Sequence, residues 1–502
     1  MRSIQFIVAV LLGLVITAGA QPTNQTSRSL SVQDCILLGL QHNLDVQIAR
    51  YSPIIDQFNL TGAYGAYDPV FSMSAKENYR ASGGGFNSTA GLTVPANQNY
   101  DETYSSGLSG LLPSGLTYNL SGNLDRNSGT TTIGSNMFNR GFLYQSFAGI
   151  TLDQPLLKNF WTDASRQQIW VNKKTLKIDE LALRQQILTT VTLVEQAYYE
   201  LIFAFENVKV QQKALELAER LLAENKKRVE VGALAPLDEK QSASQAAASR
   251  ADLLAAQNTL SMQQNVLKNL IADEYTAWHG VLIEPSQKLL PEPQQYNLQE
   301  SWKKGLAMRP DLLQLRVDLE RRDIMLRYQR NQLYPQLDLV GSYGRSGLAT
   351  TLSPSLADIN DERLPAYSYG AVLSFPLGNR TASNTARATK AAKEQAVLQY
   401  KKLEQNVLVQ IDDSVKLAQS DFERVDATRE ARIYAEAALD AEQKKLENGK
   451  STSFLVLQAQ RDLTASRSAE IRALADYNKA LSQLALNEGT TLERNKLSVV
   501  IK

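Results

Sequence analysis

The stretch RVEVGALAPL, from Arg228 to Leu237, interrupts a very long helical pattern. Before it, apolar residues recur at alternating steps of four and three, which is typical of a coiled-coil seam: Ile187, Val191, Val194, Tyr198, Leu201, Phe205 and Val208. Gly232 is suited to end one helix and Pro236 to begin the next. The stretch therefore predicts a sharp reversal between two antiparallel helices.

A second seam follows this turn and supports the returning helix: Leu253, Ala256, Leu260, Gln263, Leu267 and Leu270. A first helix from about 162 to 230 would be roughly 100 Å long at 1.5 Å per residue, longer than an ordinary globular domain. A second reversal of the same kind is expected from Lys445 to Phe454, around Gly449.

The composition of the chain argues against nucleic-acid binding and against a disulfide-stabilised fold. The 502 residues leave room for two or three domains, and 21% charged residues with a net charge of +1 give no field that would attract nucleic acid. Cys35 is the only cysteine, so no disulfide forms within the chain.

Residues 1–20 read as a cleaved signal peptide, with Arg2, an apolar run from Phe6 to Ile16, and Ala18-Gly19-Ala20 before the cleavage point. A membrane anchor is the alternative, but the run is too short for a bilayer core of about 30 Å. No later stretch offers about 18 consecutive apolar residues, so any membrane crossing would use strands.

An internal repeat divides the chain. Gly39 and Asp45 match Gly305 and Asp311 at one constant offset. Each half is predicted to contain a helix, a strand region, a long helix, a tip and a returning helix. The strand regions alternate apolar and polar residues with aromatics near the strand ends, which suits a membrane barrel wall: Phe71 to Lys76, Leu337 to Tyr343 and Tyr367 to Phe375.

The first half carries extra residues in its strand region. Leu112-Pro113-Ser114-Gly115 reads as a turn between two possible strands, Tyr104–Leu111 and Leu116–Leu124. The sequence leaves open whether this pair joins the wall, and a soluble β-hairpin domain is the alternative to a barrel.

Together, the signal peptide, the twofold repeat, the two strand regions, the two long hairpins and the Val-Gly-x-x-x-Pro-Leu-Asp tip resemble the outer membrane efflux proteins, the TolC-like family. The resemblance implies an α+β fold in which antiparallel coiled-coil hairpins form an α-barrel and strands of three copies share one transmembrane β-barrel. Four strands per copy would give twelve, and the inserted pair would make eighteen. The expected signal peptide covers residues 1–20. Repeat 1 is expected to consist of a helical segment at 21–68, strands at 69–157 and a helical hairpin at 158–271 with its tip near 228–238. After a linker at 272–297, repeat 2 is expected to consist of a helical segment at 298–334, strands at 335–378 and a hairpin at 379–487 with its tip near 445–455, followed by a tail at 488–502.

The family resemblance assigns roles to the tips. Adaptor docking is expected at Gly232, Leu234, Pro236, Leu237, Gly449, Ser451 and Phe454, although these residues could instead cap their own hairpins. Asp238 matches a gate aspartate, although a carboxylate facing a helix dipole is the alternative. The matching positions Ser451, Leu455 and Gln458 lack the family's acidic entrance ring and gate arginine. The small residues from Ser242 to Ala248 could let hairpins slide or could simply pack tightly.

The sequence offers few residues for a catalytic site, because His42 and His279 are the only histidines. Ser82-Gly83-Gly84-Gly85 is not followed by the Gly-Lys-[Ser/Thr] that a phosphate-binding loop needs. We expect no enzyme, cofactor or metal site. The predicted function is the outer-membrane exit duct of a tripartite efflux or type I secretion system, a homotrimer partnered by a periplasmic adaptor, an inner-membrane pump and outer-membrane lipid. The alternatives are a periplasmic coiled-coil adaptor without a channel and a secreted enzyme on a helical scaffold.

Overall fold

The computed structural model describes residues 27–497 apart from 88, 90, 95, 134, 135, 233, 362 and 363, so the expected signal peptide lies outside the described residues. The chain divides into two units. Unit 1 contains the residues up to Leu44, Thr190–Gln294 and Lys416–Gln483, and unit 2 contains Asp45–Thr189, Gln295–Val415 and the residues from Leu484 on.

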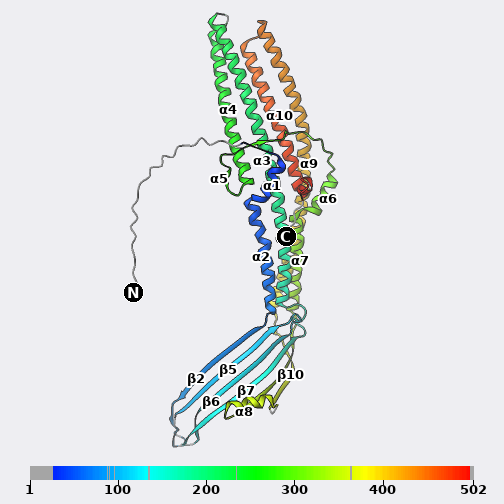
Figure 1. Ribbon diagram of the computed structural model, residues 1–502. Coiled ribbons are helices and arrows are strands. Elements are labelled where there is room, and N and C mark those ends of the chain that lie inside the picture. The colour runs from blue at the N-terminus through cyan, green and yellow to red at the C-terminus, as the bar shows by residue number, and fades with distance from the viewer. Residues whose placement is uncertain are drawn as a thin grey trace, which may run out of the picture. The chain divides into compact units, whose positions relative to one another are not determined.

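Four long helices dominate the chain: α3 (Ala164–Glu230), α4 (Pro236–Ile271), α9 (Arg380–Glu447) and α10 (Ser453–Glu488). Figure 1 shows α3 turning back into α4 and α9 turning back into α10. Helices α3 and α9 contribute residues to both units. Among the described helices, none combines the length and the apolar character that a bilayer-spanning helix needs.

The predicted seams are largely confirmed. In α3, five of the predicted residues are buried: Ile187, Val191, Val194, Tyr198 and Leu201. In α4, the prediction is wrong by one position near the end, because Gln264 and Ile271 are buried instead of Gln263 and Leu270. A straight helix has 3.6 residues per turn, so a strict seven-residue pattern drifts away from its buried face.

A small sheet explains why Gln264 is buried. Strand β8 (Leu282–Pro285) pairs in parallel with β1 (Ser27–Leu30). The Gln264 amide donates to the carbonyl oxygen of Ile283 at 3.2 Å, and its oxygen accepts from the Ile283 backbone N–H at 3.1 Å. The segment expected as a linker thus contains β8 and a short helix, α5 (Tyr275–Trp278). Both elements have only four residues, so they show no periodic pattern in the sequence.

Cys35 lies buried in α1 (Val32–His42), where burial raises the pKa of its thiol to about 12. The folded protein therefore favours the neutral thiol, and this contribution to stability is present below the unfolded pKa near 9 and is lost as the pH rises from there towards 12. We expect urea midpoints to fall more between pH 8 and pH 10 for the native chain than for Cys35→Ala. Equal falls would contradict this, as would rapid alkylation of the folded protein at pH 8.

Unit 2 contains α2 (Leu44–Ala63) from its second residue on, the 3-10 turn η1 (Tyr64–Tyr67), α6 (Leu298–Met308), α7 (Pro310–Asn331) and α11 (Thr491–Arg494). Its helical core is a cluster of buried residues: Leu312, Val407, Ile411, Val415 and Leu484. A side chain at Gly305 would collide with the Ile411 side chain, so glycine allows α6 to pack closely against α9.

The other part of unit 2 is a six-stranded antiparallel sheet in the order β10-β9-β7-β6-β5-β2. The strands are β2 (Val70–Ser82), β5 (Asn97–Leu111), β6 (Thr117–Ile133), β7 (Asn136–Pro155), β9 (Gln336–Ala349) and β10 (Pro365–Ser374). A separate hairpin pairs β3 (Gly85–Asn87) with β4 (Leu92–Val94). The possible strands of the insert are confirmed within β5 and β6, and both belong to the six-stranded sheet.

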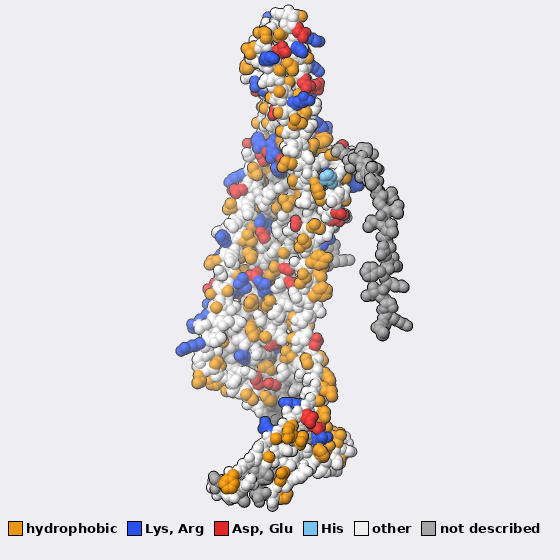
Figure 2. Space-filling view, turned by 90° about the vertical axis from the view of Figure 1, so that its left-hand side faces the viewer, with side chains coloured by type: hydrophobic (Ala, Val, Ile, Leu, Met, Phe, Trp, Pro, Cys, Tyr) orange, Lys and Arg blue, Asp and Glu red, His pale blue; other side chains and the backbone are white. Residues whose placement is uncertain are grey.

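The register gives this sheet two different faces. One row across all six strands is apolar: Phe71, Leu108, Leu120, Ile150, Tyr343 and Tyr367. The next row points to the other side and is small or polar: Ser72, Gly107, Ser121, Gly149, Gly344 and Ala366. We call these sides the apolar face and the polar face. Figure 2 shows hydrophobic side chains over the strands, with few charges among them.

Between the predicted strands Leu337 to Tyr343 and Tyr367 to Phe375, the polar and proline-containing sequence from about 345 to 365 predicts a loop, and this prediction is wrong. Strand β9 continues to Ala349, and a helix, α8 (Leu352–Asn360), follows it. Helix α8 lies against β7 and β9 (Figure 1). Pro354 is tolerated because it stands in the first turn of this helix, where its missing N–H has no helical partner.

Candidate functional site

The candidate site comprises the two tips of the long hairpins, both in unit 1. At the first tip, the Gly232 N–H donates to the Val229 carbonyl at 2.9 Å, and Gly232 has a φ of 79°. At the second tip, Gly449 has a φ of 69°, and the Lys450 N–H donates to the Lys445 carbonyl at 2.8 Å. Glycine suits both turns because other residues rarely adopt this left-handed backbone.

The tips present apolar side chains to solvent in this single chain. Leu237 is 66% exposed and Phe454 is 50% exposed, while Pro236 is exposed and Leu234 is half-buried. Ser451 instead bonds within its own hairpin, because its hydroxyl donates to the Glu442 carboxylate at 2.6 Å. The predicted docking residues therefore form an apolar end with Leu237 and Phe454 as its most exposed large members.

Glu442 anchors the second tip. Its carboxylate accepts from the Lys445 ammonium at 2.6 Å as well as from Ser451. These two hydrogen bonds, that from Lys445 first, hold the pKa of Glu442 below its usual range. Ser451 thus helps to fix the turn and is partly buried in this chain.

Asp238 lies in the first turn of α4, where a carboxylate faces the positive end of the helix dipole. Within the described residues, its carboxylate has neither a hydrogen-bond nor an ion-pair partner. Leu455 is exposed and Gln458 is exposed, so both matching positions on α10 present their side chains to solvent.

Asn225 joins the two hairpins just behind the tips, and the sequence analysis missed it. Its fully buried amide donates to the Ser242 hydroxyl of α4 at 2.7 Å and accepts from the Ser453 hydroxyl of α10 at 3.2 Å. The Ser242 hydroxyl also donates to the Asp238 carbonyl at 2.8 Å. A spacing signal was present, because Asn225 follows Leu221 by four residues in the buried stripe of α3.

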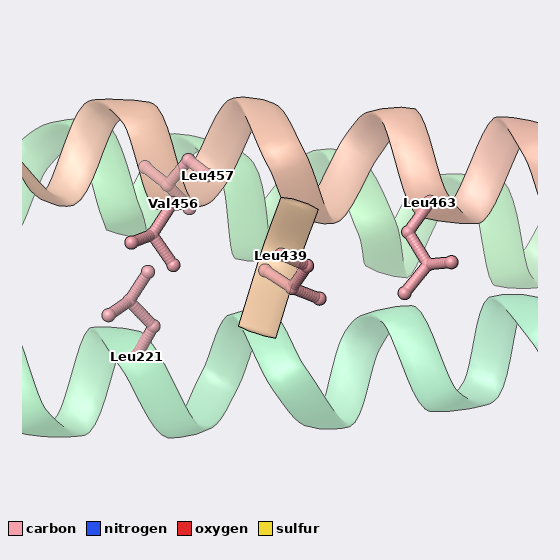
Figure 3. Close-up of a cluster of buried hydrophobic side chains, with 5 residues drawn as sticks. All are labelled: Leu221, Leu439, Val456, Leu457 and Leu463. Atoms are coloured by element: carbon pink, nitrogen blue, oxygen red, sulfur yellow. The ribbon is translucent and has the colours of Figure 1, made fainter. Parts of the chain in front are cut away.

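A hydrophobic cluster packs beside this polar link. It joins three helices through Leu221 of α3, Leu439 of α9, and Val456, Leu457 and Leu463 of α10. Figure 3 shows Leu221 and Val456 pointing toward each other between their helices. The two hairpins are therefore packed together near the tips by apolar contacts as well as by Asn225.

Ion pairs align α10 with its neighbours farther from the tips. Glu470 of α10 binds Arg432 of α9 at 2.6 Å, and Arg472 binds Glu200 of α3 at 2.6 Å. These partly exposed pairs contribute little energy individually, but together they favour one register between the helices.

The small-residue run from Ser242 to Ala248 borders a groove. Its walls come from α3, α4 and α10 and include Ala214, Ala248 and Ala465, around a volume of about 470 Å³. Ser242 and Ala246 are buried, so part of the run packs tightly while Ala248 lines the groove.

The histidines lie apart from the tips. His42 ends α1 and contacts the Asp273 carboxylate at 3.1 Å, and the ring of His279 packs edge-on against Tyr275. Among the described residues, no group of three or more His, Cys, Asp or Glu side chains could hold a metal ion.

Comparison with known proteins identifies the family. The family model described as "Outer membrane efflux protein" matches residues 99–273 and 303–490. The chain belongs to this family. Among curated proteins, Outer membrane protein TolC of Vibrio cholerae is 27% identical over 364 residues, which cover 68% of this chain and 78% of the relative.

Solved structures of this kind share the fold. The outer membrane protein VceC of Vibrio cholerae superposes with a TM-score of 0.66 at 18% identity, covering 91% of this chain and 96% of VceC. The CmeC outer membrane channel of Campylobacter jejuni also gives a TM-score of 0.66, at 13% identity, covering 97% of this chain and 94% of CmeC. The α+β fold class expected for the outer membrane efflux family is thus shown for this chain.

Proposed function

We propose that this protein is the outer-membrane exit duct of a tripartite efflux or type I secretion system. As a homotrimer, it passively conducts substrate that an inner-membrane pump delivers through a periplasmic adaptor. The family membership and the channel relatives support this proposal. The observation that carries it is the six-stranded sheet, which has one apolar face, one polar face and, in the described part of the chain, two edges without a further strand.

The two faces have the chemistry of a membrane pore wall. The apolar face would meet lipid, and the polar face would line water. On the polar face, hydroxyl groups of adjacent strands bond each other, as Ser74 does with Ser105 at 2.8 Å and Ser342 with Ser368 at 2.7 Å. The strands have 10 to 20 residues, and about 9–11 tilted residues suffice to span a bilayer.

The edges of the sheet require further copies. Among the described strands, β2 and β10 each pair on one side only, so their other backbone groups need partners inside a membrane. Because six alternating strands make β2 and β10 antiparallel to each other, β2 of one copy can pair with β10 of the next in an all-antiparallel barrel. Six strands fall below the smallest known barrel of about 8, while three copies would give about 18.

An eighteen-stranded wall would be wider than a twelve-stranded one, because barrel diameter grows roughly in proportion to strand number. Within this proposal, the two halves of the chain remain repeats of one ancestral unit with the domain bounds given above. Equal lengths of 36 residues for α4 and α10 support that view.

The tips would form the periplasmic end of the duct. We assign Asp238 to the gate, because its carboxylate is free to meet a neighbouring copy. Leu455 and Gln458 carry no charge, so such a gate would depend on fewer ionic contacts than in relatives with an acidic ring and a gate arginine. The apolar tip residues would receive the adaptor.

Planar-bilayer recording tests the proposed duct. We expect the detergent-purified trimer to insert and to carry a stable ion current that falls as larger polyethylene glycols enter the pore. A purified trimer that carries no current under any voltage or salt condition would contradict the duct. A water-soluble monomer with a compact sheet would contradict it as well.

A further inference from the structure

Helix α8 lies on the apolar face of the sheet. Ser146 of β7 is paired with Gly347 of β9. Both residues lie on the same side of their strands as Ile150 and Tyr343, which is the apolar face, and both contact the helix. The Ser146 hydroxyl donates to the Ser355 carbonyl at 2.7 Å and lies 2.9 Å from the Ser355 hydroxyl. A side chain at Gly347 would collide with the same carbonyl, so glycine lets the helix approach.

Arg345 places a charge on this apolar face, and α8 covers it. Arg345 lies two residues from both Tyr343 and Gly347, so the three side chain positions are on the same side of β9. Its guanidinium donates to the Tyr343 hydroxyl at 3.2 Å and to the Ile359 carbonyl near the end of α8 at 3.5 Å. The guanidinium therefore has polar partners within the protein, which reduces the cost of placing its charge on the side that would meet lipid.

The helix also carries an apolar stripe. Leu352, Leu356 and Ile359 recur at helical spacing, while Ser353 and Asp358 lie on the other side. Ile359 lines a shallow groove of about 570 Å³ whose floor includes Phe71, Leu108 and Leu120. Of the other two residues in the stripe, Leu352 is 41% exposed and Leu356 is 48% exposed.

We propose that α8 is a lipid-contacting helix of the outer leaflet, with membrane acyl chains covering Leu352 and Leu356 and filling the groove between α8 and the apolar face. This inference rests on the proposed duct, which makes the apolar face the lipid side. It places α8 outside the wall, where it cannot plug the lumen. The chain connections give the depth of α8 in the membrane. Helices α7 and α9 connect to one end of β9 and β10, and α8 joins the two strands at their other end, which in the proposed duct is the outer end.

Single cysteines can test this, since Cys35 is the only native thiol. In a Cys35→Ser background, Leu356→Cys would be labelled with bimane and the protein reconstituted in phosphatidylcholine vesicles. Leu120→Cys on the apolar face and Asn119→Cys on the polar face, adjacent in β6 and both exposed, are matched controls. Quenching would be measured with doxyl-labelled lipids and with aqueous iodide.

We expect the Leu356 probe to match the Leu120 probe, with at least severalfold stronger quenching by doxyl lipid than the Asn119 probe shows. If Leu120 and Asn119 behave as expected but the Leu356 probe is quenched by iodide, α8 faces water and the inference fails while the duct stands. Quenching by neither agent means that protein covers α8, which also overturns the inference. If Leu120 and Asn119 are quenched alike, the two-faced wall itself fails.

Discussion

Aspartate at both Leu237 and Phe454 is expected to abolish export while the trimer remains intact. Both side chains are exposed at the tips, so the substitutions remove no buried contact in this chain. An adaptor that docks there would have to bury two carboxylates against its own apolar surface, which costs far more than the apolar contact contributes. Leu234 is half-buried, so Leu237 is a cleaner partner for Phe454 in this experiment.

Drug resistance or secretion in a strain lacking the native gene would be measured, with trimer content checked by native gel electrophoresis. The matched control combines Leu237→Met with Phe454→Leu, which keeps the surface apolar and should export normally. Full export by the double aspartate variant would show that the tips do not receive the adaptor. Loss of export in the conservative control would point to the fold of the tips instead.

Alanine at Asn225 is expected to lower the free energy of unfolding by about 1–3 kcal/mol, because the buried hydroxyl of Ser453 loses its partner. The same change removes the link between the first tip and α10. We therefore expect a lower urea midpoint and faster proteolysis at the two tips. Lys226→Ala, one residue away on the exposed side of α3, should leave both unchanged.

A rescue variant separates the polar link from simple packing. Asn225→Leu combined with Ser242→Ala and Ser453→Ala replaces the whole polar set by apolar groups of similar shape, and such replacements can be nearly neutral. We expect it to recover most of the lost stability. If Asn225→Ala unfolds at the same urea concentration as the native chain, the hydrogen bonds of Asn225 do not hold the tips together.

The strongest local patterns predicted their elements well. Glycine at 232 and 449 and proline at 236 set the tips, because left-handed turns and helix starts depend on backbone preferences of single residues. The seam of α3 was equally readable, since burial on one side of a long helix repeats many times. Helix α8 was missed because it has only 9 residues, and its contact with β7 is remote in sequence.

At the candidate site, the exposed Leu237 and Phe454 followed from the tip motif, but Asn225 did not. An asparagine within a helical stripe gives no sign of its partners, and Ser242 and Ser453 belong to two other helices. The docking role of Ser451 stays a prediction from the family resemblance, and no sequence pattern indicated the hydrogen bond from its hydroxyl to Glu442. Side-chain partners across helices depend on how the hairpins pack.

The sequence by itself determined the long hairpins, their turns and the alternation of the strands, because these follow from periodicity and from backbone preferences that act over a few residues. Only the tertiary structure decided that β5 and β6 stand between β2 and β7, and which side of the sheet α8 covers. Strand order and register arise from pairing between distant segments, and no local pattern specifies which segments meet.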